Sequence, residues 1–320
     1  GGREGLATTP CASGLPHANT ADNWFDIVNF GGKDAVINSY LVTALSKMEE
    51  MAEYLGGVHA GESGKWQRLH SAAVSSFNTQ LWNASVGLYS DWIDTAGGRR
   101  NYFYVWQQFN AIDPASGIAN SSRAAAMMAT IDRLYGDIRA RYNKTQTELW
   151  CTPTNLDAAR GANWSGIAWW DSVLQNGVEL GDQQYFGHYE NGCCFMALTG
   201  LEIAARGQAG DPDGAAQLVK RAMDNFNATI FWGQHFDWCG GEHCEQPAAG
   251  FNAGDVLTNS IMVLYGAVHS LFGFRTDLRG VHVVGRPATT LREGASHSFT
   301  HLGERVTLTV QGGKTVVSHG

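Results

Sequence analysis

The clearest pattern of apolar and polar positions lies over residues 33–55, where apolar side chains recur every three or four residues. This spacing predicts an amphipathic helix with one buried face. The expected face consists of Val36, Tyr40, Leu41, Leu45, Met48, Met51 and Leu55. A Gly-Gly pair at 56–57 should end this helix. A second helix is predicted over about residues 64–82, so the two should form an antiparallel hairpin.

The same order of loop, helix, turn and helix recurs further along the chain. The predicted elements are an extended piece over residues 87–94 and helices over residues 101–112, 121–135, 187–206, 211–226 and 254–272. Asp211 should cap its helix, with Pro212 in the first helical position. Repeated hairpins predict a mainly α protein, an (α/α)6-type toroid with inner and outer helices. Its pocket should lie where the loops before the inner helices converge.

After residue 273 the pattern changes to alternation of apolar and polar residues. The segments "GVHVVGRPATTLREG" and "ERVTLTVQGGKTVVSHG" alternate in this way and turn at glycines, which is typical of β-strands. We therefore expect three parts. They are an N-terminal extension or linker over residues 1–21, an α/α-barrel domain over residues 22–274 and a short β-sandwich-like segment over residues 275–320.

The composition narrows the expected partners. The 320 residues carry a net charge of −8 without a basic run, which argues against nucleic acid or an anionic membrane surface as partner. The longest apolar stretches, such as residues 260–274, are too short and interrupted to insert in a bilayer. The chain holds 11 Trp, 10 Tyr and 14 Phe, and aromatic rings of this abundance suit stacking on the apolar faces of sugars. We expect a carbohydrate substrate.

Sequons and cysteines indicate the secretory pathway or the extracellular space. The Asn-X-Ser/Thr triplets begin at Asn83, Asn120, Asn143, Asn163 and Asn227, so we expect a glycoprotein. The six cysteines are compatible with disulfides, although the pairing cannot be deduced. The segment "CGGEHC" offers two thiols and one His but no fourth ligand at a usual spacing, so no metal is expected. No cofactor is expected either.

Acidic residues recur in the loops that precede the predicted inner helices. These acids are Asp22, Asp26, Asp34, Asp91, Asp94, Glu190, Asp237, Glu242, Glu245 and Asp255. Hydrolysis of a glycosidic bond requires two carboxyl groups that face one pocket, one protonated and one ionised. Any single acid is more often a helix cap or a solvated side chain. The chain contains no phosphate-binding loop, no dinucleotide-binding glycine motif and no nucleophile elbow.

The segment "NWFDIVNFGGKDAVINSYLVTAL", residues 23–45, resembles the six-hairpin (α/α)6-barrel glycosidases. These include glycogen-debranching amylo-α-1,6-glucosidases and their trehalase and α-glucosidase relatives. Further segments that look like this clan are "GLYSDWID", "YFYVWQQFNAIDPASGIA", "WCTPTNL", "FGHYENGCCFMALTGLEIAAR" and "LFGFRTDLRGVHV". The resemblance spans roughly residues 22–284 and implies an inverting glycoside hydrolase acting on α-linked glucosides or related saccharides.

Carried over position by position, the resemblance implies Asp26 as the general acid. It places the base in the loop before the last inner helix, with Glu242 as the first choice and Glu245 as the second. The substrate-binding residues it implies are Trp24, Lys33, Asp34, Trp170, Tyr189 and Glu190. Inversion would separate the two catalytic carboxyl groups by roughly 6.5–9.5 Å.

Two other functions stay open on the sequence. A complete barrel of this clan has more helices than are predicted here, so we expect further segments of a larger polypeptide to be a partner. An incomplete pocket favours the alternative of a catalytically inactive glycan-binding or structural domain of a large extracellular glycoprotein. An α/α-barrel sugar epimerase would use paired histidines, which the motif loops lack.

Overall fold

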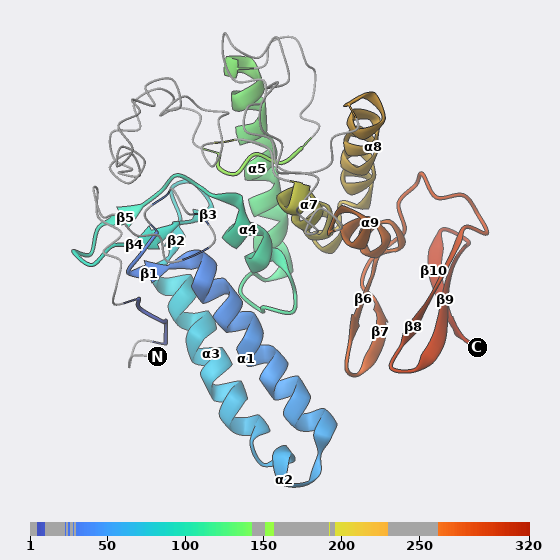
Figure 1. The fold of residues 1–320 in the computed structure, drawn as a ribbon, viewed down its shortest axis with the longest axis horizontal. Coiled ribbons are helices and arrows are strands. Elements are labelled where there is room, and N and C mark those ends of the chain that lie inside the picture. Colours follow the sequence, from blue (N-terminus) through green and yellow to red (C-terminus); the bar gives the residue numbers. More distant parts are fainter. Residues whose placement is uncertain are drawn as a thin grey trace.

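The structure is a computed structural model, and it describes residues 5–9, 23, 25, 28, 30–142, 151–156, 192, 196–229 and 262–320 (Figure 1). The helices are α1 (Ala35–Leu55), α2 (Gly57–Ala60), α3 (Ser63–Gln80), α4 (Val105–Ile112), α5 (Ser121–Tyr142), α7 (Met196–Gln208), α8 (Pro212–Thr229) and α9 (Met262–Phe272). The described part is mainly helical with small antiparallel sheets, as predicted. Closure of the hairpins into a toroid stays a prediction, as do the domain boundaries.

Helices α1 and α3 lie side by side and antiparallel, joined by the short α2, and project from the rest of the molecule (Figure 1). This is the predicted hairpin. Its base packs into the main core through Val42 of α1 and through Ala73 and Phe77 of α3, which are fully buried. The chain leaves α1 at Gly56, whose φ of 62° lies in the left-handed region that favours glycine.

The predicted buried face of α1 was wrong for four of its residues. The exposed fractions are 48% for Tyr40, 37% for Met48, 45% for Met51 and 60% for Leu55. The buried positions of α1 are instead Ala35, Val36, Asn38, Ser39, Val42, Glu50 and Ala52. Most of these side chains are small, which lets α3 and α4 approach α1 closely.

Helices α7 and α9 pack tightly because glycines and a serine line their contact. A Cβ atom on Gly207 of α7 would lie 2.6 Å from the Cβ of Ser270 in α9, which is closer than side chains can pack. Helix α8 then lies against α7 and α9. As predicted, Pro212 begins α8, and Asp211 caps it by accepting a hydrogen bond from the Gly214 N–H at 2.9 Å.

Two groups of short strands complete the described structure. Near the N-terminal ends of α1 and α4 are β1 (Lys33–Asp34), β2 (Trp82–Asn83), β3 (Leu88–Tyr89), β4 (Trp92–Ile93) and β5 (Arg99–Arg100). At the C-terminus are β6 (Phe274–Asp277), β7 (Gly280–Val283), β8 (Ser296–His301), β9 (Glu304–Gln311) and β10 (Lys314–His319). Strands β6 and β7 form one antiparallel pair, and β10, β9 and β8 form a second sheet in that order.

The C-terminal strands share one hydrophobic core, as a sandwich-like arrangement requires. Phe274 of β6 and Val306, Leu308 and Val310 of β9 are buried together with Phe272 of α9. The last helix therefore ends inside the core of the β segment. No helix within the described ranges is long and apolar enough to cross a membrane.

Candidate active site

The N-terminus of α1 is organised by Asp34, which is fully buried. Its Oδ1 accepts hydrogen bonds from the N–H groups of Val36 at 2.7 Å and Ile37 at 3.1 Å, so Asp34 is the N-cap of the helix. Its Oδ2 accepts a hydrogen bond from Asn23 Nδ2 at 2.8 Å, and Asn23 Oδ1 in turn accepts one from the Phe25 N–H at 2.8 Å. Asn23 and the backbone of Phe25 are thereby tethered to the start of α1.

Phe25 is also fixed by packing in a cluster of aromatic rings. Its ring is fully buried and lies 5.2 Å from Phe30 and 4.7 Å from Tyr104, measured between ring centroids. Trp106 of α4 meets Phe25 edge to face at 5.9 Å. Contacts of this geometry add about 0.5–1.5 kcal/mol per pair beyond burial of area. The residue that immediately precedes Asp26 is therefore held by both backbone and side chain.

Two rings at this end of the molecule form a shelf that solvent reaches. Trp106 Nε1 donates a hydrogen bond to the Tyr40 hydroxyl at 2.6 Å, and the two ring centroids are 6.4 Å apart. Tyr40 comes from α1 and is half exposed. We call Tyr40 and Trp106 the aromatic shelf. A polar edge beside an open aromatic face is the chemistry that binds a sugar ring.

The loop before α4 is built around Asp91, a fully buried carboxyl group. The N–H groups of Tyr102, Phe103 and Tyr104 donate to it at 2.5, 2.9 and 2.8 Å, and Gln107 Nε2 donates at 2.6 Å. Phe103 has a φ of 55°, which turns these successive N–H groups toward one anion. Burial nevertheless raises the pKa of Asp91 to about 7, because the hydrogen bonds only partly offset the loss of solvation.

A third acid of this region, Asp94, holds the turn between β4 and β5. Its Oδ1 accepts hydrogen bonds from the N–H groups of Ala96 at 3.0 Å and Gly98 at 2.7 Å, and its Oδ2 pairs with Arg100 at 2.7 Å. The carboxyl groups of Asp34, Asp91 and Asp94 thus all accept hydrogen bonds from neighbouring backbone and side-chain groups of the protein. Their contacts shape the candidate site and do not by themselves supply a catalytic pair.

The structure places only some of the predicted site residues. Lys33 Nζ donates to Gln80 Oε1 at 2.7 Å, and Asp34 caps α1, so their contact with sugar hydroxyls stays a prediction. The predicted site residues outside the described residues are Trp24, Asp26, Trp170, Tyr189, Glu190, Glu242 and Glu245. Sequence reasoning missed the aromatic shelf, because Tyr40 belongs to an apolar helical stripe and only the crossing of α1 with α4 brings it to Trp106.

Two of the sequons have described side chains. Asn83 Oδ1 accepts hydrogen bonds from the Ser85 N–H at 3.1 Å and hydroxyl at 2.6 Å, and Asn120 Oδ1 accepts one from the Arg123 N–H at 2.9 Å. Asn143, Asn163 and the side chain of Asn227 lie outside the described residues. Glycosylation stays a prediction.

Cys151 is disulfide-bonded. The other cysteines lie outside the described residues. Among the described residues no group of His, Cys, Asp and Glu could hold a metal ion.

Comparison with known proteins supports the class of fold. No family model matches the chain, and a search of curated proteins gives no match either. Among solved structures, the chain resembles that of a family GH78 rhamnosidase from Bacillus sp. GL1, with a TM-score of 0.52 and 14% identity. The alignment covers 96% of this chain and 26% of the rhamnosidase chain, so this chain spans about a quarter of its length. The similarity concerns the fold.

Proposed function

We propose that the chain is a glycoside hydrolase that cleaves its substrate with inversion, with Asp26 as general acid and Glu242 or Glu245 as base. The observation that carries the proposal is the double anchoring of Phe25, through Asn23 to Asp34 and through the aromatic cluster. Phe25, which precedes Asp26 in the sequence, is thereby held beside the N-terminus of α1. A catalytic acid needs such a rigid support.

The aromatic shelf supports a sugar as the substrate. Tyr40 and Trp106 present ring surface and one hydroxyl group near the N-terminal part of α1, on the side where we expect the pocket. The substrate we expect is an α-linked glucoside. An α-linked rhamnoside is the second candidate, because the fold resembles part of a rhamnosidase. The competing function is a glycan-binding domain that retains sugars without turnover.

The test is release of the free sugar from methyl α-D-glucoside and methyl α-L-rhamnoside, whose alkoxide leaving groups must be protonated by the general acid. Asp26→Asn should lower the rate by about 10²–10⁴-fold, the contribution of general acid catalysis. Asp137→Asn is the matched control, because Asp137 is an exposed acid on α5 that pairs only with Arg133 among described residues. Tyr40→Ala should raise KM and leave kcat within about threefold. Retention of glycans by a wild-type protein that shows no turnover at any pH would favour the binding domain.

A further inference from the structure

A polar cavity lies away from the aromatic shelf. It has a volume of about 200 Å³ and is lined by residues from α1, α4, α7, α9 and β6. The polar side chains around it include Lys47, Asn110, Asp113, Gln208, Tyr265 and Arg275. Asp113 follows the C-terminal end of α4, whereas Asp91 and the aromatic shelf lie at its N-terminal end. The eight residues of α4 separate the two ends by about 12 Å.

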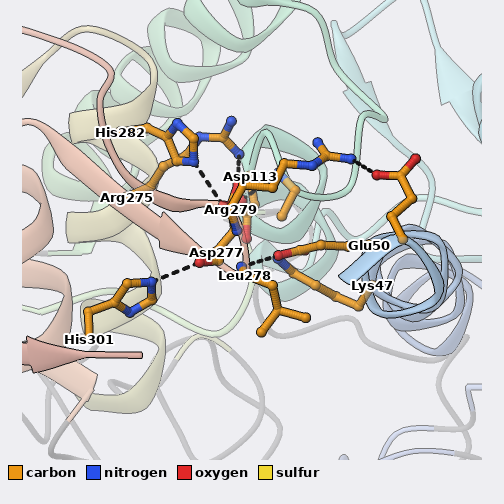
Figure 2. Close-up of polar contacts among 11 residues, drawn as sticks. Lys47, Glu50, Asp113, Arg275, Asp277, Leu278, Arg279, His282 and His301 are labelled. Carbon is orange, nitrogen blue, oxygen red and sulfur yellow. Dashed lines mark hydrogen bonds and ion pairs between the residues drawn. The ribbon is translucent and has the colours of Figure 1, made fainter. Parts of the chain in front are cut away.

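One charged group that lines the cavity is the carboxyl of Asp113. Only the N–H of Ala115 among the described residues donates to it, at 2.9 Å. Lys47 and Arg275 lie close enough to favour its ionised form, yet neither forms an ion pair with it among the described contacts. Figure 2 shows Asp113 between these two side chains. Burial raises the pKa of Asp113, and the two cations partly oppose this. The carboxyl group therefore keeps acceptor capacity that faces the cavity.

The two cations already have counter-charges on their outer sides. Lys47 Nζ is 2.7 Å from Glu50 Oε2, and Arg275 Nη1 is 3.9 Å from Asp277 Oδ2 (Figure 2). With Asp113 also present, the surroundings carry no excess positive charge. An inorganic anion would have to enter against three carboxylates, so a neutral ligand with both donors and acceptors fits better.

One wall of the cavity is a supported aromatic ring. Tyr265 is 53% exposed, and its ring lies 4.1 Å from His269, which stacks on Phe274 at 4.4 Å and 16°. The contact with His269, which Phe274 supports, fixes the orientation of Tyr265 and leaves part of its ring surface open to a ligand. Burial lowers the pKa of His269, so its imidazole is neutral near pH 7.

We propose that this cavity binds one neutral monosaccharide, with hydroxyl groups shared between Asp113 and Arg275 and with its apolar face on Tyr265. Carboxylate and guanidinium groups bind adjacent sugar hydroxyls as acceptor and donor, and the ring supplies the apolar contact. The volume is below the roughly 300–1,000 Å³ of pockets for larger ligands, which limits the ligand to about one sugar ring. The cavity is separate from the aromatic shelf, and binding of a sugar there does not require hydrolytic activity.

Isothermal titration with D-glucose and with L-rhamnose tests the proposal. Asp113→Asn and Arg275→Gln should each weaken the binding of at least one of these sugars by tenfold or more. Asp113→Asn keeps an oxygen for the Ala115 N–H, so the loop should stay folded. If either variant proves unstable, Tyr265→Leu tests the same site, because loss of the aromatic ring should also weaken sugar binding. The matched controls are Asp137→Asn and Arg286→Gln, which alter exposed ion pairs elsewhere and should bind as the wild type does.

Three outcomes would overturn the proposal. They are wild-type affinity in the Asp113, Arg275 and Tyr265 variants, the absence of sugar binding, and tighter binding of inorganic phosphate than of either sugar. Tyr40→Ala separates this site from the proposed hydrolytic site. Sugar binding that is lost in Tyr40→Ala and kept in Asp113→Asn belongs to the aromatic shelf and contradicts the cavity. A cavity that binds sugar in a protein without turnover would contradict only the hydrolase proposal.

Discussion

At the scale of single residues, the buried carboxyl group of Asp91 is the most constrained group near the aromatic shelf. Four hydrogen-bond donors converge on it, and it is removed from solvent. A carboxyl group in these surroundings binds its proton more tightly in the folded chain than in the unfolded chain, as its raised pKa of about 7 indicates. The stability of the protein should therefore depend on pH through this residue.

The direction of this dependence follows from proton binding. Between about pH 4 and pH 7 the unfolded chain has lost the proton of Asp91 while the folded chain retains it, so rising pH lowers stability. We expect the free energy of unfolding of the wild type, relative to Asp91→Asn, to fall by about 2–3 kcal/mol between pH 5 and pH 8. Urea unfolding of the wild type and of Asp91→Asn at pH 5 and at pH 8 measures this change in the free energy of unfolding. A difference that stays constant or grows with pH would contradict the raised pKa.

At the scale of elements, α5, α7 and the turn into α8 are joined by one buried cation. Arg206 of α7 contacts Glu202 at 2.8 Å, Asp132 of α5 at 2.5 Å and Asp211 at 3.1 Å. Glu202 also accepts hydrogen bonds from the hydroxyls of Tyr135 at 2.7 Å and Thr152 at 2.5 Å. Burial, reinforced by the Glu202 charge, raises the pKa of Tyr135 well above its usual value, so its hydroxyl stays a donor.

Loss of this cation should loosen the packing of the three helices. Arg206→Met leaves Glu202 buried without a counter-charge, and we expect it to lower the free energy of unfolding by about 3–5 kcal/mol. Adding Glu202→Gln should recover part of that loss. Arg133→Met, which removes an exposed pair with Asp137 on α5, should cost about 0.5 kcal/mol or less. Equal urea midpoints for the Arg206 and Arg133 variants would show that the buried network contributes little.

The elements themselves were largely predictable, but the faces they bury were not. Apolar periodicity and caps identified α1, α3 and α8 to within a few residues, since these signals are local. The same periodicity could not reveal that Ser39 of α1 would face Asn110 of α4, whose Nδ2 donates to the Ser39 hydroxyl at 3.0 Å. Tyr40 was therefore expected in the core and is exposed. Which stripe of a helix is buried depends on neighbours that are distant in sequence.

At the scale of the whole molecule, the C-terminal β segment reaches back to the first long helix. The turn between β6 and β7 meets α1, where the Leu278 N–H donates to Glu50 Oε1 and Arg279 pairs with Glu53 (Figure 2). Glu50 and Leu278 are 228 positions apart along the chain. Asp277 orders the same turn through His282, whose Nε2 lies 2.8 Å from Asp277 Oδ1. No local pattern could predict a contact over this separation.

Glu50 and Glu53 of α1 allow the contribution of this contact to stability to be measured. Glu50 is buried and accepts a backbone N–H, so Glu50→Ala leaves the Leu278 donor unsatisfied and should cost about 1–3 kcal/mol of unfolding free energy. Glu53 is exposed and pairs with an exposed arginine, so Glu53→Ala should cost distinctly less. Urea unfolding gives the difference between the two variants.

Hydrogen exchange would locate the part of the β segment that becomes less stable when the contact between Glu50 and the Leu278 N–H is lost. Because the Glu50 contact holds the turn itself, amides of residues 274–283 should exchange faster in Glu50→Ala and at the wild-type rate in Glu53→Ala. Amides of β9, which lie in the core of the second sheet, should keep their protection in both variants and serve as the internal reference. Faster exchange across β9 as well would mean that the β segment unfolds as a unit once it leaves α1, and the turn would then be its principal attachment to the helical part.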